Sequence, residues 1–148
     1  MRRVKKLRWA RYVGDGPVLP RPKKQSGRMG VGYEKKVFKE IRKKEVMVRK
    51  GQWIAFEDEN GPGMAQTDFL VQTEGGLVVL EAKLTFTHEA WDQLSFKYVP
   101  LLEAVEPPSV EIIPAQVCKS LTPEIDGTVV VEDFSEIRAW AVWHFLGR

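Results

Sequence analysis

Two short apolar segments joined by a glycine-rich turn constrain this chain more than any other feature of its sequence. Residues 66–72 and 77–83 both alternate between two faces, as β-strands do. The four residues between them, 73–76, read Thr-Glu-Gly-Gly and are typical of a hairpin connection. We therefore expect an antiparallel hairpin, around which the other elements must be arranged.

The hairpin is predicted to bring two carboxylates and an ammonium group together. A turn centred on residues 75–76 pairs residues whose numbers sum to 151, which places Asp68 opposite Lys83 and diagonal to Glu81. Directly opposite side chains lie about 5 Å apart and diagonal ones about 7–8 Å apart. The simplest alternative is an ordinary Asp68–Lys83 ion pair, worth at most about 1 kcal/mol if it is exposed.

The remaining pattern predicts an α/β fold, with a single mixed β-sheet flanked by helices. Apolar spacing predicts helices over 31–44 and 135–146, and a helix that starts after Thr87 and is kinked or ended at Pro100. Four further segments complete the expected fold: a strand over 47–56 that bends at Gly51, a turn over 57–63, and strands over 110–117 and 129–131. The core order is then α, β, β, β, α, β.

Charge divides the chain in two. The first 50 residues hold 18 Lys and Arg against four acidic side chains, whereas the last 98 hold five against sixteen. We expect residues 1–28 to form a flexible basic arm on a domain over 29–148, and the charge to attract a polyanion. Trp9 and Tyr12 in the arm could stack on bases. A merely solvated arm is the alternative.

Composition excludes several classes of protein. One cysteine cannot form an internal disulfide, and one cysteine with two histidines cannot build a tetrahedral zinc site. No apolar run approaches the roughly 18 residues that span a bilayer. We expect a cytoplasmic protein with no membrane partner.

A third carboxylate lies on the first predicted helix. Glu34 shares a face with Phe38 and Ile41, so it follows the buried stripe and needs a cation or hydrogen-bond donors. Its position near the helix start also suits an acidic side chain that interacts with the helix dipole, which is the structural alternative. Neighbouring carboxylates are stabilised by Mg²⁺ or Mn²⁺, and such an ion activates water for phosphodiester hydrolysis. Lys83 could orient that water or offset charge in the transition state.

These residues resemble a known family. The pattern Gly30-x-x-x-Glu34, Asp68 and Glu81-Ala82-Lys83 is similar to the PD-(D/E)XK nucleases, specifically the RecB-like and phage exonuclease branch. The resemblance implies a restriction-endonuclease-like αβββαβ core. It also implies that Asp68, Glu81 and the backbone carbonyl of Ala82 bind the metal, that Lys83 assists the attacking water, and that Glu34 completes the site.

The same branch carries a glutamine and a tyrosine on the helix after the Glu-x-Lys strand. Gln93 and Tyr98 occupy that helix, but five residues apart instead of the usual four, and Thr67 stands where a proline often precedes the first aspartate. The resemblance implies nucleic-acid contacts for this pair. From their charge, further contacts are expected from the basic residues of the arm and first helix: Arg28, Lys35, Lys36 and Lys39.

We therefore predict a Mg²⁺- or Mn²⁺-dependent deoxyribonuclease of a bacterium or phage. One alternative is a non-catalytic nucleic-acid-binding or interaction module that keeps the nuclease fold, and another is a junction-resolving or repair endonuclease. Exonuclease or endonuclease action, RNA as the substrate and assembly into a homo-oligomer stay open at this point.

Overall fold

The computed structural model describes residues 3–14, 25–42, 47–73, 75–85, 88–120 and 130–131. The helix predicted over 135–146 lies outside these residues. The elements follow one another along the chain in this order: β1 (Trp9–Val13), α1 (Gln25–Arg42), β2 (Val48–Lys50), β3 (Trp53–Asp58), β4 (Gly61–Gln66), β5 (Phe69–Thr73), β6 (Gly76–Thr85), α2 (His88–Gln93), the π-helix η1 (Leu94–Tyr98), α3 (Val99–Val105), β7 (Ile112–Ser120) and β8 (Val130–Val131).

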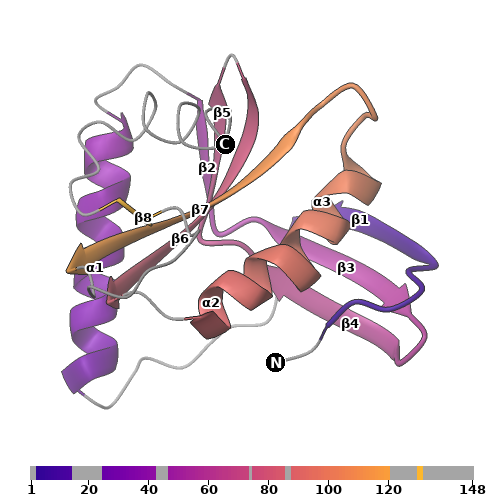
Figure 1. Ribbon diagram of the computed structural model, residues 1–148, viewed down its shortest axis with the longest axis horizontal. Coiled ribbons are helices and arrows are strands. Elements are labelled where there is room, and N and C mark those ends of the chain that lie inside the picture. The colour runs from indigo at the N-terminus through magenta and orange to yellow at the C-terminus, as the bar shows by residue number, and fades with distance from the viewer. Residues whose placement is uncertain are drawn as a thin grey trace.

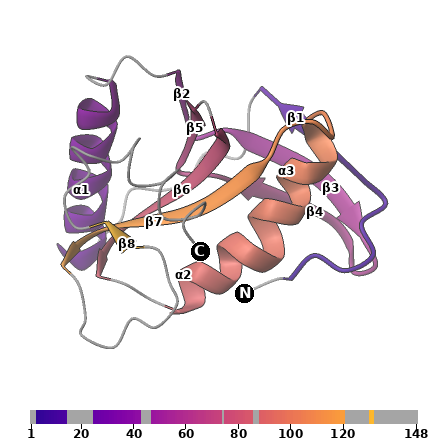
Figure 2. The ribbon, with the colours of Figure 1, turned by 45° about the horizontal axis from the view of Figure 1, so that its top comes forward.

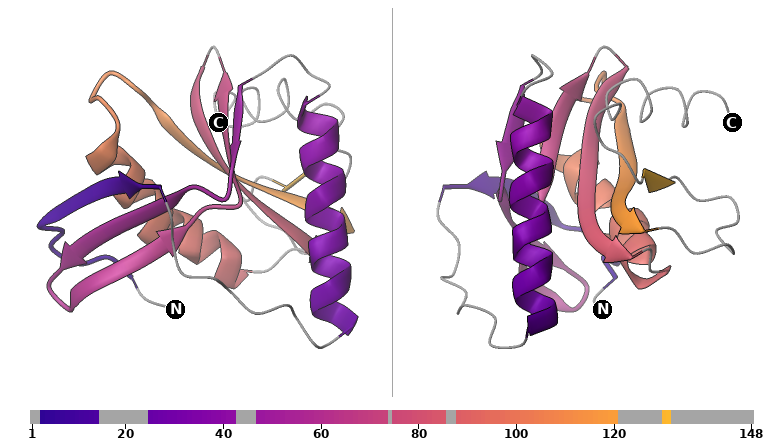
Figure 3. Two further views of the ribbon diagram at one scale, coloured as in Figure 1. Left: turned by 180° about the vertical axis from the view of Figure 1, so that it is seen from behind. Right: turned by 90° about the vertical axis from the view of Figure 1, so that its left-hand side faces the viewer.

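A five-stranded mixed sheet forms the centre of the α/β fold, in the order β2-β5-β6-β7-β8. β5 runs antiparallel to both β2 and β6, whereas β6, β7 and β8 run parallel to one another. Helix α1 covers one face of this sheet (Figures 1 and 3). Its apolar stripe of Tyr33, Val37 and Ile41 packs on the alternate strand residues that point to that side. The order α1, β2, β5, β6, helices, β7 matches the order expected from the sequence.

A second, three-stranded antiparallel sheet has the order β1-β3-β4. The helical segment α2–η1–α3 crosses between this sheet and the larger one (Figure 2). Leu94, Leu101 and Leu102 are fully buried there, packed against residues of both sheets. The segment thus joins the two sheets through one apolar cluster.

The expected α/β core, a mixed sheet flanked by helices, is confirmed, and a second sheet is present beside it because two segments depart from their predicted form. The strand predicted over 47–56 is two strands, since Gly51 takes a left-handed conformation (φ 64°) and the chain passes from one sheet to the other. The predicted turn over 57–63 is confined to residues 59–60, and β4 begins at Gly61. Pro62 is tolerated because β4 is an edge strand.

The predicted flexible arm is also wrong for residues 9–13, which form β1 and pair with β3. Tyr12 is partly buried, with the Arg49 guanidinium 5.1 Å from the centre of its ring, and it donates a hydrogen bond to Glu106 (2.8 Å), whereas Trp9 is 42% exposed. Helix α1 starts at Gln25, so the expected boundary at residues 28–29 falls inside it. Among the described residues, no helix is both long and apolar enough to cross a membrane.

Candidate metal centre

The β5–β6 hairpin has a different register from the predicted one. Thr73 pairs with Gly76 and Phe69 with Leu80, so partner numbers sum to 149 instead of 151. Extending the ladder by one position sets Asp68 opposite Glu81 instead of Lys83. A shift of two residues keeps every side chain on its predicted face, which is why the predicted cluster persists.

Asp68 lies just before β5, where the ladder has ended. Its Oδ2 accepts a hydrogen bond from the Ala82 N–H (3.0 Å), in the place of the next main-chain bond. In a strand, the N–H and C=O of one residue point to the same side, so the Ala82 carbonyl also faces this edge. Burial raises the pKa of Asp68, and the Ala82 N–H and the Lys83 charge act in the opposite direction.

Glu81 is a buried acid, 3% exposed, in the middle of β6. The side chains of Glu81 and Asp68 lie close enough to form a hydrogen bond once one of the two acids is protonated. Burial, and then the charge of Asp68, raise the pKa of Glu81 well above its usual range. Oε1 of Glu81 is buried and has no hydrogen-bond partner among the described residues. An orphaned carboxylate oxygen of this kind is costly unless a cation or donor meets it.

Glu34 stands on α1, half-buried beside this pair. Burial, and then the negative charge of Asp68, raise the pKa of Glu34 to about 7, against the pull of Lys50 and Lys83. Within the described part of the chain, no three acidic, histidine or cysteine side chains come close enough to hold an ion together. The place of Glu34 among the metal ligands stays a prediction, and its negative charge contributes to the raised pKa of Glu81.

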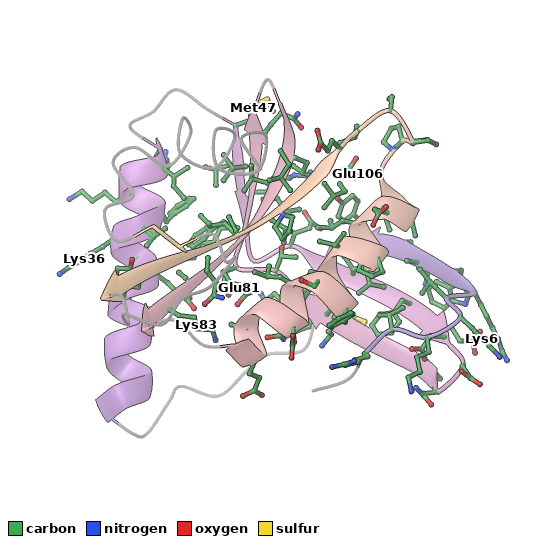
Figure 4. All side chains as sticks on the ribbon, in the orientation of Figure 1. Lys6, Lys36, Met47, Glu81, Lys83 and Glu106 are labelled. Atoms are coloured by element: carbon green, nitrogen blue, oxygen red, sulfur yellow. The ribbon has the colours of Figure 1, made fainter. Side chains whose placement is uncertain are left out.

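Two lysines offset part of the negative charge of the three acids. Lys83 lies two residues beyond Glu81 on β6, and Figure 4 shows both between α1 and α2. Lys50, which the sequence analysis did not single out, lowers the pKa of Glu34 and of Asp68. Its partner in the β2–β5 ladder is Phe69, the neighbour of Asp68, and its ammonium lies 5.2 Å from the centre of the Phe38 ring. Only the strand pairing, which a single sequence does not reveal, could have identified it.

Gln93 and Tyr98 come together despite their five-residue spacing. The Gln93 side-chain amide donates to the Tyr98 hydroxyl (3.0 Å), which donates to the Gln66 carbonyl (2.9 Å). The intervening residues form η1, in which the Val99 N–H bonds to the Leu94 carbonyl five residues earlier. A π-turn holds one more residue than an α-turn, so it brings positions five apart onto the same side.

The chain passes between the two sheets from β2 to β3 and again from β4 to β5, and these two crossings are tied together. The Gln66 side-chain amide donates to the Gly51 carbonyl (3.2 Å), and the Gly51 N–H donates to the Asp68 carbonyl (3.1 Å). Between these bonds, the Thr67 N–H donates to the Gln52 carbonyl (3.1 Å). The main chain at Asp68 is thus fixed on both sides, and Thr67, fully buried, takes part in this junction.

Three of the basic residues predicted to bind nucleic acid face solvent. Lys35, Lys36 and Lys39 are exposed on α1, and Lys36 points away from Glu81 and Lys83 (Figure 4). The side chain of Arg28 lies outside the described residues. In the N-terminal segment, Lys6 forms an ion pair with Glu59 (3.8 Å), so part of the basic charge there is offset within the molecule.

The residues present fit a hard divalent cation. Mg²⁺ is commonly held by one or two carboxylates, with water and phosphate oxygens completing its shell. The Asp68–Glu81 pair with its unpartnered Oε1 meets that requirement, and an ion there would remove the need to protonate one of the two acids.

Comparison with known proteins extends to the fold alone. No protein-family model and no curated protein matches the sequence. The fold is similar to the crystal structure of protein VC1899 from Vibrio cholerae, with a TM-score of 0.53 and 12% sequence identity. The alignment covers 82% of this chain and 37% of the Vibrio chain, so this chain spans little more than a third of that protein.

Proposed function

We propose that this protein is a Mg²⁺- or Mn²⁺-dependent nuclease that hydrolyses phosphodiester bonds of DNA. The observation that carries the proposal is the Asp68–Glu81 pair. Two adjacent acids, one of them buried with a carboxylate oxygen that no described residue meets, destabilise a metal-free fold and suit a cation. The resemblance of Glu34, Asp68 and Glu81-Ala82-Lys83 to the PD-(D/E)XK nucleases supports the same reaction class.

Each residue has a role in this proposal. Asp68, Glu81 and the Ala82 carbonyl would hold the ion, which would supply acidification of water and compensation of negative charge on the phosphoryl oxygens. Lys83 orients the attacking water by donating a hydrogen bond, and its positive charge favours the transition state over the ground state. Glu34, with its pKa raised to about 7, accepts a proton from water near neutral pH.

The first experiment is Mn²⁺ calorimetry followed by degradation of linear DNA. Wild type should bind Mn²⁺ and cleave, and Asp68→Asn or Glu81→Gln should lose both properties. Glu103→Gln, on an exposed position of α3, is the matched control and should behave as wild type.

The outcomes separate this function from its rivals. Mn²⁺ binding that Glu81→Gln leaves unchanged would remove the assigned centre. DNA binding without Mn²⁺ binding or cleavage would favour a non-catalytic binding module with the nuclease fold. Faster cleavage of four-way junctions than of linear duplex would indicate a junction-resolving enzyme.

A further inference from the structure

We propose that Tyr98 is a positioning residue: its hydroxyl holds the end of β4 and thereby sets Asp68 in place opposite Glu81. This inference rests on the proposed function, since it assigns Tyr98 to the support of the same centre. It replaces the expectation that Tyr98 contacts nucleic acid.

The hydrogen bonds of Tyr98 leave it no donor for a phosphate. A phenol has one O–H, and that proton is directed at the Gln66 carbonyl (2.9 Å). The oxygen in turn accepts from the Gln93 amide (3.0 Å). The side chain is 5% exposed and lies in the apolar cluster between the two sheets. The Tyr98 hydroxyl therefore uses its hydrogen bonds within the protein.

The bond to Gln66 acts on Asp68 because only Thr67 separates the two residues. Two main-chain hydrogen bonds fix residues 66–68 from the β2–β3 side. The Gly51 N–H donates to the Asp68 carbonyl, and the Thr67 N–H donates to the Gln52 carbonyl. The hydrogen bond from the Tyr98 hydroxyl to the Gln66 carbonyl fixes the same segment from the side of the helices. Without it, the carbonyl of Gln66 loses its partner and the segment that leads into Asp68 is anchored from one direction only.

The negative charges of Glu81 and Asp68 act electrostatically on the Tyr98 hydroxyl. Burial raises the pKa of the Tyr98 phenol, and the charges of Glu81 and Asp68 raise it further. The hydroxyl thus supports the centre from just outside the expected ligand shell. Residues in such a position fix the orientation of ligands, and their loss costs about 10- to 100-fold in metal affinity.

The test is Mn²⁺ calorimetry on Tyr98→Phe, which removes the hydroxyl and keeps the buried ring. We expect Mn²⁺ affinity to fall about 10-fold or more. Gln93→Ala leaves the bond to Gln66 in place, so its loss of affinity should be smaller. Tyr12→Phe is the matched control, because it also removes a tyrosine hydroxyl that donates a hydrogen bond. The acceptor of that bond is the Glu106 carboxylate (2.8 Å), and both residues are distant in sequence from Asp68 and Glu81.

The control separates positioning from general stability. Both Tyr→Phe variants should lower the urea midpoint, but only Tyr98→Phe should weaken Mn²⁺ binding and raise the KM for Mn²⁺ in DNA cleavage. Equal Mn²⁺ affinity in wild type and Tyr98→Phe would overturn the inference and leave the metal centre standing. A wild-type protein that binds no Mn²⁺ would overturn the proposed function, and the positioning role with it.

Discussion

At the scale of single residues, the centre is built from groups that oppose folding. Glu81 is almost completely buried, lies beside the acid Asp68 and has one oxygen that no described residue meets with a hydrogen bond. Glu34 adds a third acid whose pKa is raised to about 7. Functional sites commonly hold such strain, which the rest of the fold must offset.

Replacing Glu81 should therefore stabilise the metal-free protein. Glu81→Gln keeps the shape of the side chain and removes an acid that burial disfavours in its charged form, so we expect a gain of about 0.5–2 kcal/mol in the free energy of unfolding. Urea unfolding at pH 8 without metal measures it. A loss of stability in this variant would mean that the carboxylate is structural.

Glu34 should give the metal-free protein a characteristic dependence on pH. The pKa is about 7 in the fold against 4.5 for the unperturbed group, so the folded state binds more protons than the unfolded state between these values. Stability should consequently fall as pH rises from 4.5 to 7. Thermal unfolding of Glu34→Gln should show a shallower decline across this window, and an unchanged profile would contradict the prediction.

At the scale of elements, Gly51 controls how β2 passes into β3. Its φ of 64° is unfavourable for other residues, and an added Cβ would lie 2.9 Å from the Gln66 side-chain nitrogen. Gly51→Ala should destabilise the fold by about 1–2 kcal/mol. Gly32→Ala is the control: it is helical with nothing within 4 Å, so it should stabilise by about 0.5–1 kcal/mol. Urea midpoints compare the two.

The sequence predicts correctly those elements in which apolar residues recur at a regular spacing. The alternation of residues 66–72 and 77–83 placed Asp68, Glu81 and Lys83 on one face, and that face survives a two-residue error in register. β4 was missed because Gly61-Pro62-Gly63 carries every turn signal, and the fold admits it only at a sheet edge. β1 was missed because its five residues stand among charges.

Other parts of the site depend on contacts that one sequence does not contain. Lys50 reaches the acids through the β2–β5 pairing, and the role of Gln66 depends on its backbone carbonyl, which has no signature in a sequence. The pairing of Gln93 with Tyr98 follows from the π-turn, for which helical periodicity gives no signal.

At the scale of the whole molecule, basic charge lies on separate surfaces. Lys35, Lys36 and Lys39 are exposed on α1, whereas Lys6 near β1 is paired with Glu59. If DNA crosses α1, replacing the three α1 lysines by Gln should lower the slope of log affinity against log salt by up to about 0.9 for each lost phosphate contact. Lys6→Gln should change it less. Fluorescence anisotropy across salt concentrations measures both.

The π-turn at Leu94–Tyr98 bears on how relatives of this chain can be found. A consensus that fixes four positions from glutamine to tyrosine rejects a chain with five, yet here the wider turn delivers both side chains to a common hydrogen bond. Searches that tolerate one inserted residue at this point would recover chains whose three-dimensional arrangement agrees while their linear spacing does not.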